Sequence, residues 1–154
     1  MDIFTVSLFG HRDISDPRDF EERLFRTVTE LLRKKDYVTF LLGRNGDFDI
    51  YAASVIKRAQ RELGYKNAEV VCVLPYANKN SEYYERYYDG VIIPECVEKI
   101  HPKNAIKTRN RWMVEQSELV ICFVKRHSGG AYLALKYGEK LGKRVVNISS
   151  ENCE

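Results

Sequence analysis

The chain contains 154 residues, of which 44% are hydrophobic and 31% charged, and its formal net charge is +3. The hydrophobic fraction is too high for a disordered chain, and the length suits one domain with a single core. No apolar run approaches the roughly 18 residues that cross a membrane, and the N-terminus lacks a signal-peptide core. The net charge is too small to indicate nucleic acid by itself. We therefore expect a soluble, cytoplasmic protein with one domain over residues 1–148 and a tail over 149–154.

Apolar runs alternate with segments of helical periodicity, which is the pattern of an α/β protein with a parallel sheet. A first strand is expected over residues 3–9. Asp16 followed by Pro17 has the residue types of a helix start, and the helix it predicts ends at 33–35. Further strands are expected over 37–42, 69–74, 91–93, 119–124 and 144–148, and further helices from near 47 to 63, over 81–88, over 104–117 and from 129–130 to 141.

The cysteines and histidines do not form a pattern of metal ligands. The four cysteines are not paired at metal-ligand spacing and the three histidines are scattered, so we expect no metal site. Cys72 and Cys122 lie inside apolar strands, where a reduced thiol serves as a small core residue. We expect these two thiols to be buried and structural.

Ligands of open parallel sheets bind at the carboxyl ends of the strands, where loops lead into helices. Four such loops carry unusual residues, and they span 10–12, 43–49, 75–79 and 125–130. In the last loop, Gly129 and Gly130 at a helix start permit close backbone approach, and the exposed N–H groups favour an anion. The alternative is a tight strand-to-helix turn, because no GxGxxG or Walker lysine pattern is present.

The first of these loops consists of Gly10, His11 and Arg12. Arg12 can offer a planar fork to a phosphate or a carboxylate. Alternatively, it forms a salt bridge with Asp13 or Asp16. His11 either belongs to the site or is a structural imidazole that packs the loop.

The loop at 43–49 contains two carboxylates, Asp47 and Asp49. One of them is expected to cap the following helix. The other either accepts ribose hydroxyls, as acidic residues near Rossmann phosphate loops do, or performs acid–base work at a glycosidic bond. Arg109 and Arg111 lie two positions apart and cannot share a helix face, so only one of them should point into the site. Asn110 between them either binds ligand or holds the turn.

Four tyrosines at positions 83, 84, 87 and 88 form two pairs at helical i,i+4 spacing. They could form a stacking lid over a nucleobase. The interpretation that we favour is a helix that packs on the sheet or on a second subunit.

Four segments in this order resemble the YpsA-like branch of the SLOG superfamily, which is named for Smf/DprA and LOG. They are Ser7 to Arg12, the loop at 43–49 with Ala52-Ala53 beyond it, Arg109 to Glu118, and Ser128-Gly129-Gly130 with its helix. The resemblance covers roughly residues 3–148. It implies a Rossmann-like three-layer sandwich, with a mostly parallel, twisted sheet flanked by helices, that binds nucleotides or nucleotide-derived ligands in bacteria.

Some relatives in that superfamily, the LOG-type phosphoribohydrolases, cleave the N-glycosidic bond of nucleoside monophosphates. Their hallmark is a Pro-Gly-Gly-x-Gly-Thr-x-x-Glu run, and the counterpart here spans residues 128–136. The third glycine, the threonine and the glutamate are absent, and Lys136 stands where the catalytic carboxylate would be. The run therefore fits phosphate binding better than LOG-type hydrolysis.

Three functions are compatible with these residues, in descending order. The first is binding or sensing of a nucleotide derivative, such as an ADP-ribose-like molecule or a nucleoside phosphate. The second is hydrolysis of an N-glycosidic bond, with Asp47 or Asp49 as the catalytic candidate. The third is binding of single-stranded DNA, which the modest charge disfavours. On family grounds we also expect a homodimer or higher homo-oligomer. The expected ligand-binding residues are Gly10, His11, Arg12, Gly43, Arg44, Asn45, Gly46, Asp49, Pro75, Arg109, Asn110, Ser128, Gly129, Gly130 and Ala131.

Overall fold

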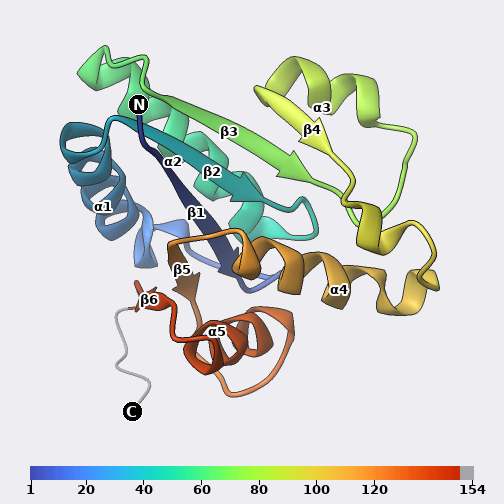
Figure 1. Ribbon diagram of the computed structural model, residues 1–154. Coiled ribbons are helices and arrows are strands. Elements are labelled where there is room, and N and C mark those ends of the chain that lie inside the picture. The colour runs from blue at the N-terminus through green and yellow to red at the C-terminus, as the bar shows by residue number, and fades with distance from the viewer. Residues whose placement is uncertain (150–154) are drawn as a thin grey trace.

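A computed structural model describes residues 1–149 and shows one six-stranded sheet in which every neighbouring pair is parallel (Figure 1). The strand order is β4-β3-β2-β1-β5-β6. This confirms the α/β, Rossmann-like fold expected from the sequence. The strands are β1 (Ile3–Gly10), β2 (Tyr37–Leu42), β3 (Ala68–Val73), β4 (Gly90–Ile92), β5 (Leu119–Phe123) and β6 (Arg144–Asn147).

Helices cover both faces of the sheet. The helices are α1 (Glu21–Lys34), α2 (Asp47–Leu63), α3 (Ser81–Tyr87), α4 (Pro102–Glu115) and α5 (Gly130–Lys140), and short 3-10 turns lie at Pro17–Asp19 and Glu95–Val97. The first three helices pack into one core cluster, and α4 and α5 pack into the other. None of the helices within residues 1–149 is long and apolar enough to span a bilayer.

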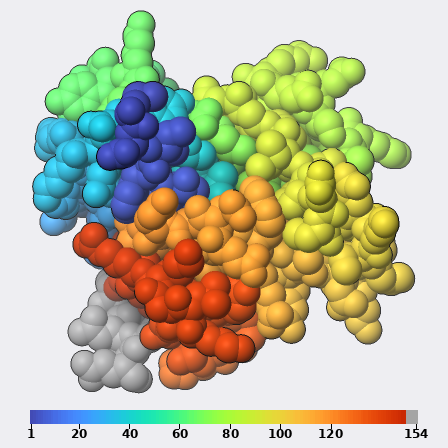
Figure 2. Space-filling model, viewed as in Figure 1, coloured from blue at the N-terminus to red at the C-terminus, as the bar shows by residue number. Residues whose placement is uncertain are grey.

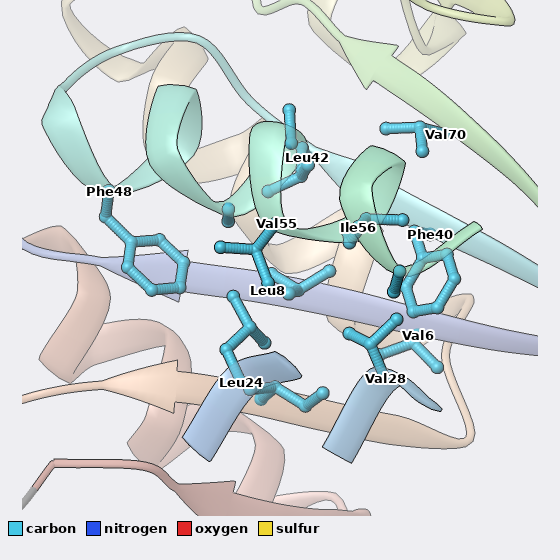
Figure 3. Close-up of a cluster of buried hydrophobic side chains, with 14 of the residues drawn as sticks. Val6, Leu8, Leu24, Val28, Phe40, Leu42, Phe48, Val55, Ile56 and Val70 are labelled. Atoms are coloured by element: carbon cyan, nitrogen blue, oxygen red, sulfur yellow. The ribbon is translucent and has the colours of Figure 1, made fainter. Parts of the chain in front are cut away.

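The larger core cluster lies between the sheet and α1 and α2 (Figure 3). Its side chains come from successive strands and from the apolar faces of the helices, as the 3.6-residue periodicity predicts. Phe20, Phe48 and Phe123 meet near the carboxyl ends of the strands, with ring centroids 5.0–6.2 Å apart. This aromatic plug lies directly beneath the loops that carry the site residues.

Two predicted helix starts are wrong by several residues. Asp16 does act as an N-cap and Pro17 as the first residue, but of a 3-10 turn, because Phe20 leaves helical geometry and buries its ring. Helix α1 therefore begins at Glu21. The helix predicted over 104–117 begins earlier, at Pro102, where the imidazole of His101 accepts a hydrogen bond from the Lys103 N–H. Proline at the first helical position fits this start.

The cysteines expected in the core are there. Cys72 and Cys122 are both free and fully buried, and burial raises the pKa of the Cys72 thiol to about 11. Cys96 is exposed. Cys153 and residues 150–154 of the expected tail lie outside the described residues.

Candidate functional site

A cavity of about 370 Å³ opens where β1, β2 and β5 end and α2 and α5 begin. It contains most of the residues expected to bind ligand, brought together from loops more than a hundred residues apart in sequence. Residues that sequence reasoning did not single out are Phe9, Asp13, Ile106 and Arg126. The full lining is Phe9, Gly10, His11, Arg12, Asp13, Gly43, Asn45, Gly46, Asp49, Ile106, Arg109, Asn110, Arg126, Gly129, Gly130 and Ala131.

Four expected site residues do not line this cavity, namely Arg44, Asp47, Pro75 and Ser128. Pro75 is buried, and Ser128 is exposed at the surface of its loop. The other two side chains have partners elsewhere, and those partners explain their positions. Asp47 Oδ2 accepts a hydrogen bond from the Ile14 N–H at 3.0 Å, which ties the β1–α1 connection to α2.

Arg44 turns away from the cavity toward α3. Its guanidinium carbon lies 5.3, 4.9, 5.9 and 5.8 Å from the ring centroids of Tyr83, Tyr84, Tyr87 and Tyr88. Tyr84 and Tyr88 are buried in the core, as the packing interpretation of this helix predicts. Cation–π attraction therefore fixes the loop after β2 to α3.

Glycines in the loops make room for neighbouring groups. A Cβ on Gly10 would lie 2.1 Å from the Phe48 ring, and one on Gly46 would lie 2.5 Å from Arg12 Cα. A Cβ on Gly43 would lie 2.7 Å from Arg109 Nη1. These positions admit no side chain without movement, which gives a packing reason for the glycine pattern.

Arg109 is the buried cation of the site, with only 3% of its surface exposed. Its Nη1 donates to the Val73 carbonyl at 2.9 Å, and its Nε donates to Asn110 Oδ1 at 3.0 Å. Burial lowers the pKa of Arg109, although nearby Asp49 opposes this effect. Arg111 points elsewhere, over the ring of Tyr137, so the two arginines divide between faces as their spacing predicts.

Asp49 is the carboxylate of the cavity. Its Oδ2 accepts a hydrogen bond from the Asn45 N–H at 3.0 Å. Burial raises the pKa of Asp49, against the lowering effects of that hydrogen bond and of Arg109, Arg12 and Arg44. The expected N-cap role is wrong for both carboxylates, because the N-cap of α2 is Gly46 and no side chain caps it.

The N-termini of α2 and α5 differ in whether their N–H groups are available. At α2, the Asp47 N–H donates to the Arg12 carbonyl at 2.7 Å and the Phe48 N–H to the His11 carbonyl at 3.4 Å. At α5, no acceptor within residues 1–149 binds the N–H groups of Gly130 or Ala131. The positive φ of Gly129, 93°, turns the chain into this helix. The free donors of the cavity are thus those of α5.

His11 links two of the site loops. Its Nε2 accepts a hydrogen bond from the Lys125 N–H at 2.8 Å, and its ring meets Phe123 edge to face. Burial, followed by the charges of Arg126 and Lys125, lowers the pKa of His11. The neutral ring with its proton on Nδ1 suits this contact. His11 lines the cavity but also holds the β1 and β5 loops together.

Neither a family model nor a curated protein sequence matches the chain. Solved structures with a similar fold include DNA processing protein A (DprA) from Streptococcus pneumoniae, with a TM-score of 0.70 and 15% identity over 99% of this chain and 52% of that one. The chain thus spans about half the length of that protein.

Two other solved structures also match. DprA from Helicobacter pylori, which binds single-stranded DNA, gives a TM-score of 0.68 and 16% identity over 98% of this chain and 67% of that one. A molybdenum cofactor binding protein from Rippkaea orientalis gives 0.64 and 18% over 94% and 76%. Identities this low show the fold alone, and the chain has the Rossmann-like fold of DprA, which is consistent with the SLOG superfamily.

Proposed function

We propose that the cavity binds a nucleotide-type small molecule, such as a nucleoside phosphate or an ADP-ribose-like compound, through its phosphate. The observation that carries this proposal is the set of unoccupied N–H groups at the start of α5, beside three arginines, Arg12, Arg109 and Arg126. Free N–H donors and the positive end of the helix dipole favour an anion. The proposal places the chain in the YpsA-like branch as a binding or sensing domain.

The arginines would contribute in different ways. Arg12 is exposed and can form a two-pronged contact with a phosphate that enters from solvent. Arg109 is fixed by Val73 and Asn110, so its charge is already in place before the ligand arrives. A preorganised cation loses little side-chain freedom on binding, which favours affinity.

Asp49 would recognise the sugar of such a ligand. One of its oxygens is occupied by the Asn45 N–H, and within residues 1–149 no hydrogen-bond donor reaches the other. Sugar hydroxyls are donors that a carboxylate at the cavity wall can accept. This role matches that of acidic residues beside Rossmann phosphate loops.

The proposal is tested by thermal shift with AMP, ADP-ribose and adenosine. A ligand at about 100 times its dissociation constant stabilises the fold by about 2.7 kcal/mol. We expect AMP and ADP-ribose to stabilise the protein and adenosine to have little effect. Arg12→Ala should lose the effect, whereas Arg18→Ala, an exposed arginine paired with Asp16, should keep it. No stabilisation by any phosphorylated compound would reject the proposal.

Hydrolysis of an N-glycosidic bond is the second candidate, favoured by Asp49. A carboxylate whose pKa is raised by burial can act as an acid or base near neutral pH. In this reaction water adds to the anomeric carbon, the carbon–nitrogen bond breaks and the base leaves with a proton. Release of free base from nucleotides that Asp49→Asn abolishes would support this activity. Lys136, at the position of the LOG glutamate, does not line the cavity.

The neighbours do not decide between ligand classes. Single-stranded DNA and the molybdenum cofactor are both bound by proteins with this fold. Binding of single-stranded DNA therefore stays a third candidate. The homo-oligomer expected from the sequence stays a prediction, which sedimentation of the purified protein would test.

A further inference from the structure

A second cavity, of about 420 Å³, lies between α4 and α5 and is called the α4–α5 groove below. It adjoins the first cavity, because Ile106, Asn110 and Gly130 line both. In the space-filling view the orange segment that contains α4 and the red-orange segment that contains α5 lie against each other at this surface (Figure 2). The two cavities are therefore continuous spaces of similar size.

The groove has an apolar floor and a cationic rim. The floor includes Leu133 and Tyr137, and Leu133 is 51% exposed although it is a leucine. No carboxylate lines the groove. The rim consists of Lys103, Lys107, Arg111, Lys136 and Lys140.

The cations repeat at helical spacing. Lys103, Lys107 and Arg111 follow one another four residues apart on α4, and Lys136 and Lys140 do so on α5. Like charges at i,i+4 destabilise a helix, and these two rows also face each other across the groove. A chain with a net charge of only +3 thus places five cations around one cavity. A bound anion would offset this repulsion.

We propose that the ligand is a dinucleotide with a phosphodiester linkage and a terminal phosphate, whose first unit occupies the cavity and whose second unit occupies the α4–α5 groove. This inference rests on the proposed function. The terminal phosphate binds at the start of α5, and the linking phosphate passes Asn110 and Gly130, which both cavities share. The second base lies on Leu133 and Tyr137, where an aromatic ring and an aliphatic side chain suit its flat apolar face.

A second copy of the chain fits the groove less well. In a two-fold interface the same patch meets itself, so these cations would face their own copies. The repulsion already present between α4 and α5 would then increase. A dinucleotide brings negative charge to the same place.

The test compares the affinities of AMP, pApA and the hexanucleotide (pA)6 by calorimetry. We expect pApA to bind at least about tenfold more tightly than AMP, and (pA)6 to gain less than about threefold over pApA. The variant Lys107→Ala/Lys140→Ala should lose most of the gain with pApA and leave AMP binding unchanged. The control Arg61→Ala/Lys66→Ala removes two exposed cations from the end of α2 and should change neither affinity.

The outcomes separate this inference from the proposed function. Equal affinities for AMP and pApA, or the same affinity for pApA in wild type and Lys107→Ala/Lys140→Ala, would overturn the dinucleotide and leave the proposed function standing. A large further gain with (pA)6 would also overturn it in favour of a longer strand. A dimer in sedimentation that Lys107→Ala/Lys140→Ala dissociates would assign the groove to a second copy. Failure of both AMP and pApA to bind would reject the proposed function itself.

Discussion

Replacing Gly43 by alanine should destabilise the protein through Arg109 alone. The added Cβ would lie 2.7 Å from Arg109 Nη1 and 3.0 Å from Cζ, and no other residue is among its closest contacts. The guanidinium must then move away from the Val73 carbonyl, to which it now donates at 2.9 Å. A hydrogen bond to a charged group contributes about 1.5–3 kcal/mol to stability.

An opposing effect comes from the unfolded chain. Gly43 does not have a positive φ, so alanine can adopt its backbone conformation. Such a replacement stabilises a protein by about 0.4–1 kcal/mol, because the unfolded chain has less freedom. The net loss in the free energy of unfolding should therefore be about 1–2 kcal/mol. At an m value of about 2 kcal/mol/M, this lowers the urea midpoint by roughly 0.5–1 M.

The sign of the effect should reverse when Arg109 is absent. In an Arg109→Ala background nothing opposes the new Cβ, so Gly43→Ala should stabilise by about 0.4–1 kcal/mol. In an Arg111→Ala background, which alters the neighbour that points away, it should keep its full cost. Urea unfolding followed by the fluorescence of Trp112, the single tryptophan, measures all six proteins. An equal cost of Gly43→Ala with and without Arg109 would refute the reasoning.

Three further predictions follow from the described contacts. Gly10→Ala forces a methyl group into the buried ring of Phe48 and should cost about 1–3 kcal/mol by urea unfolding; an unchanged midpoint would contradict this packing. The pKa of His11 is lower in the folded than in the unfolded protein, so stability should be complete above the unfolded pKa near 6.5 and decline as pH falls toward the folded pKa. His11→Gln should flatten this decline in urea midpoints between pH 5 and 7.5, and an identical slope would count against it. In a Cys153→Ser background one thiol, that of Cys96, should react quickly with a thiol reagent, while rapid reaction of all three would show that the buried thiols are accessible.

The sequence predicts the fold well because buried parallel strands are continuous apolar runs. The stretches around Val6, Phe40 and Ile121 contain almost no polar side chains and can form only buried strands. Their order then places the loops after β1, β2 and β5 at one edge of the sheet. This is why Gly10, Gly43 and Gly129 meet at one cavity as the sequence pattern predicts.

The side-chain partners inside the site could not be predicted in the same way. Arg44 lies in a glycine-rich loop, but its direction depends on tyrosines about forty residues later in the chain. Asp47 looks like an N-cap, yet its partner is the Ile14 N–H in another connection. Ile106 and Arg126 line the cavity only because of how α4 packs and where the β5 loop ends. Such contacts arise from tertiary packing and leave no local signal.

The most direct test of the phosphate site is an NMR titration of the backbone amides with AMP. The amides of Gly130 and Ala131 are free in the structure, whereas those of Asp47 and Phe48 already donate to carbonyl groups. The account predicts large downfield shifts for the two α5 amides, saturating with AMP, and small shifts for the two α2 amides. Phosphate-dependent shifts confined to α2, or no shift at α5 at saturating AMP, would contradict a phosphate site at the start of α5.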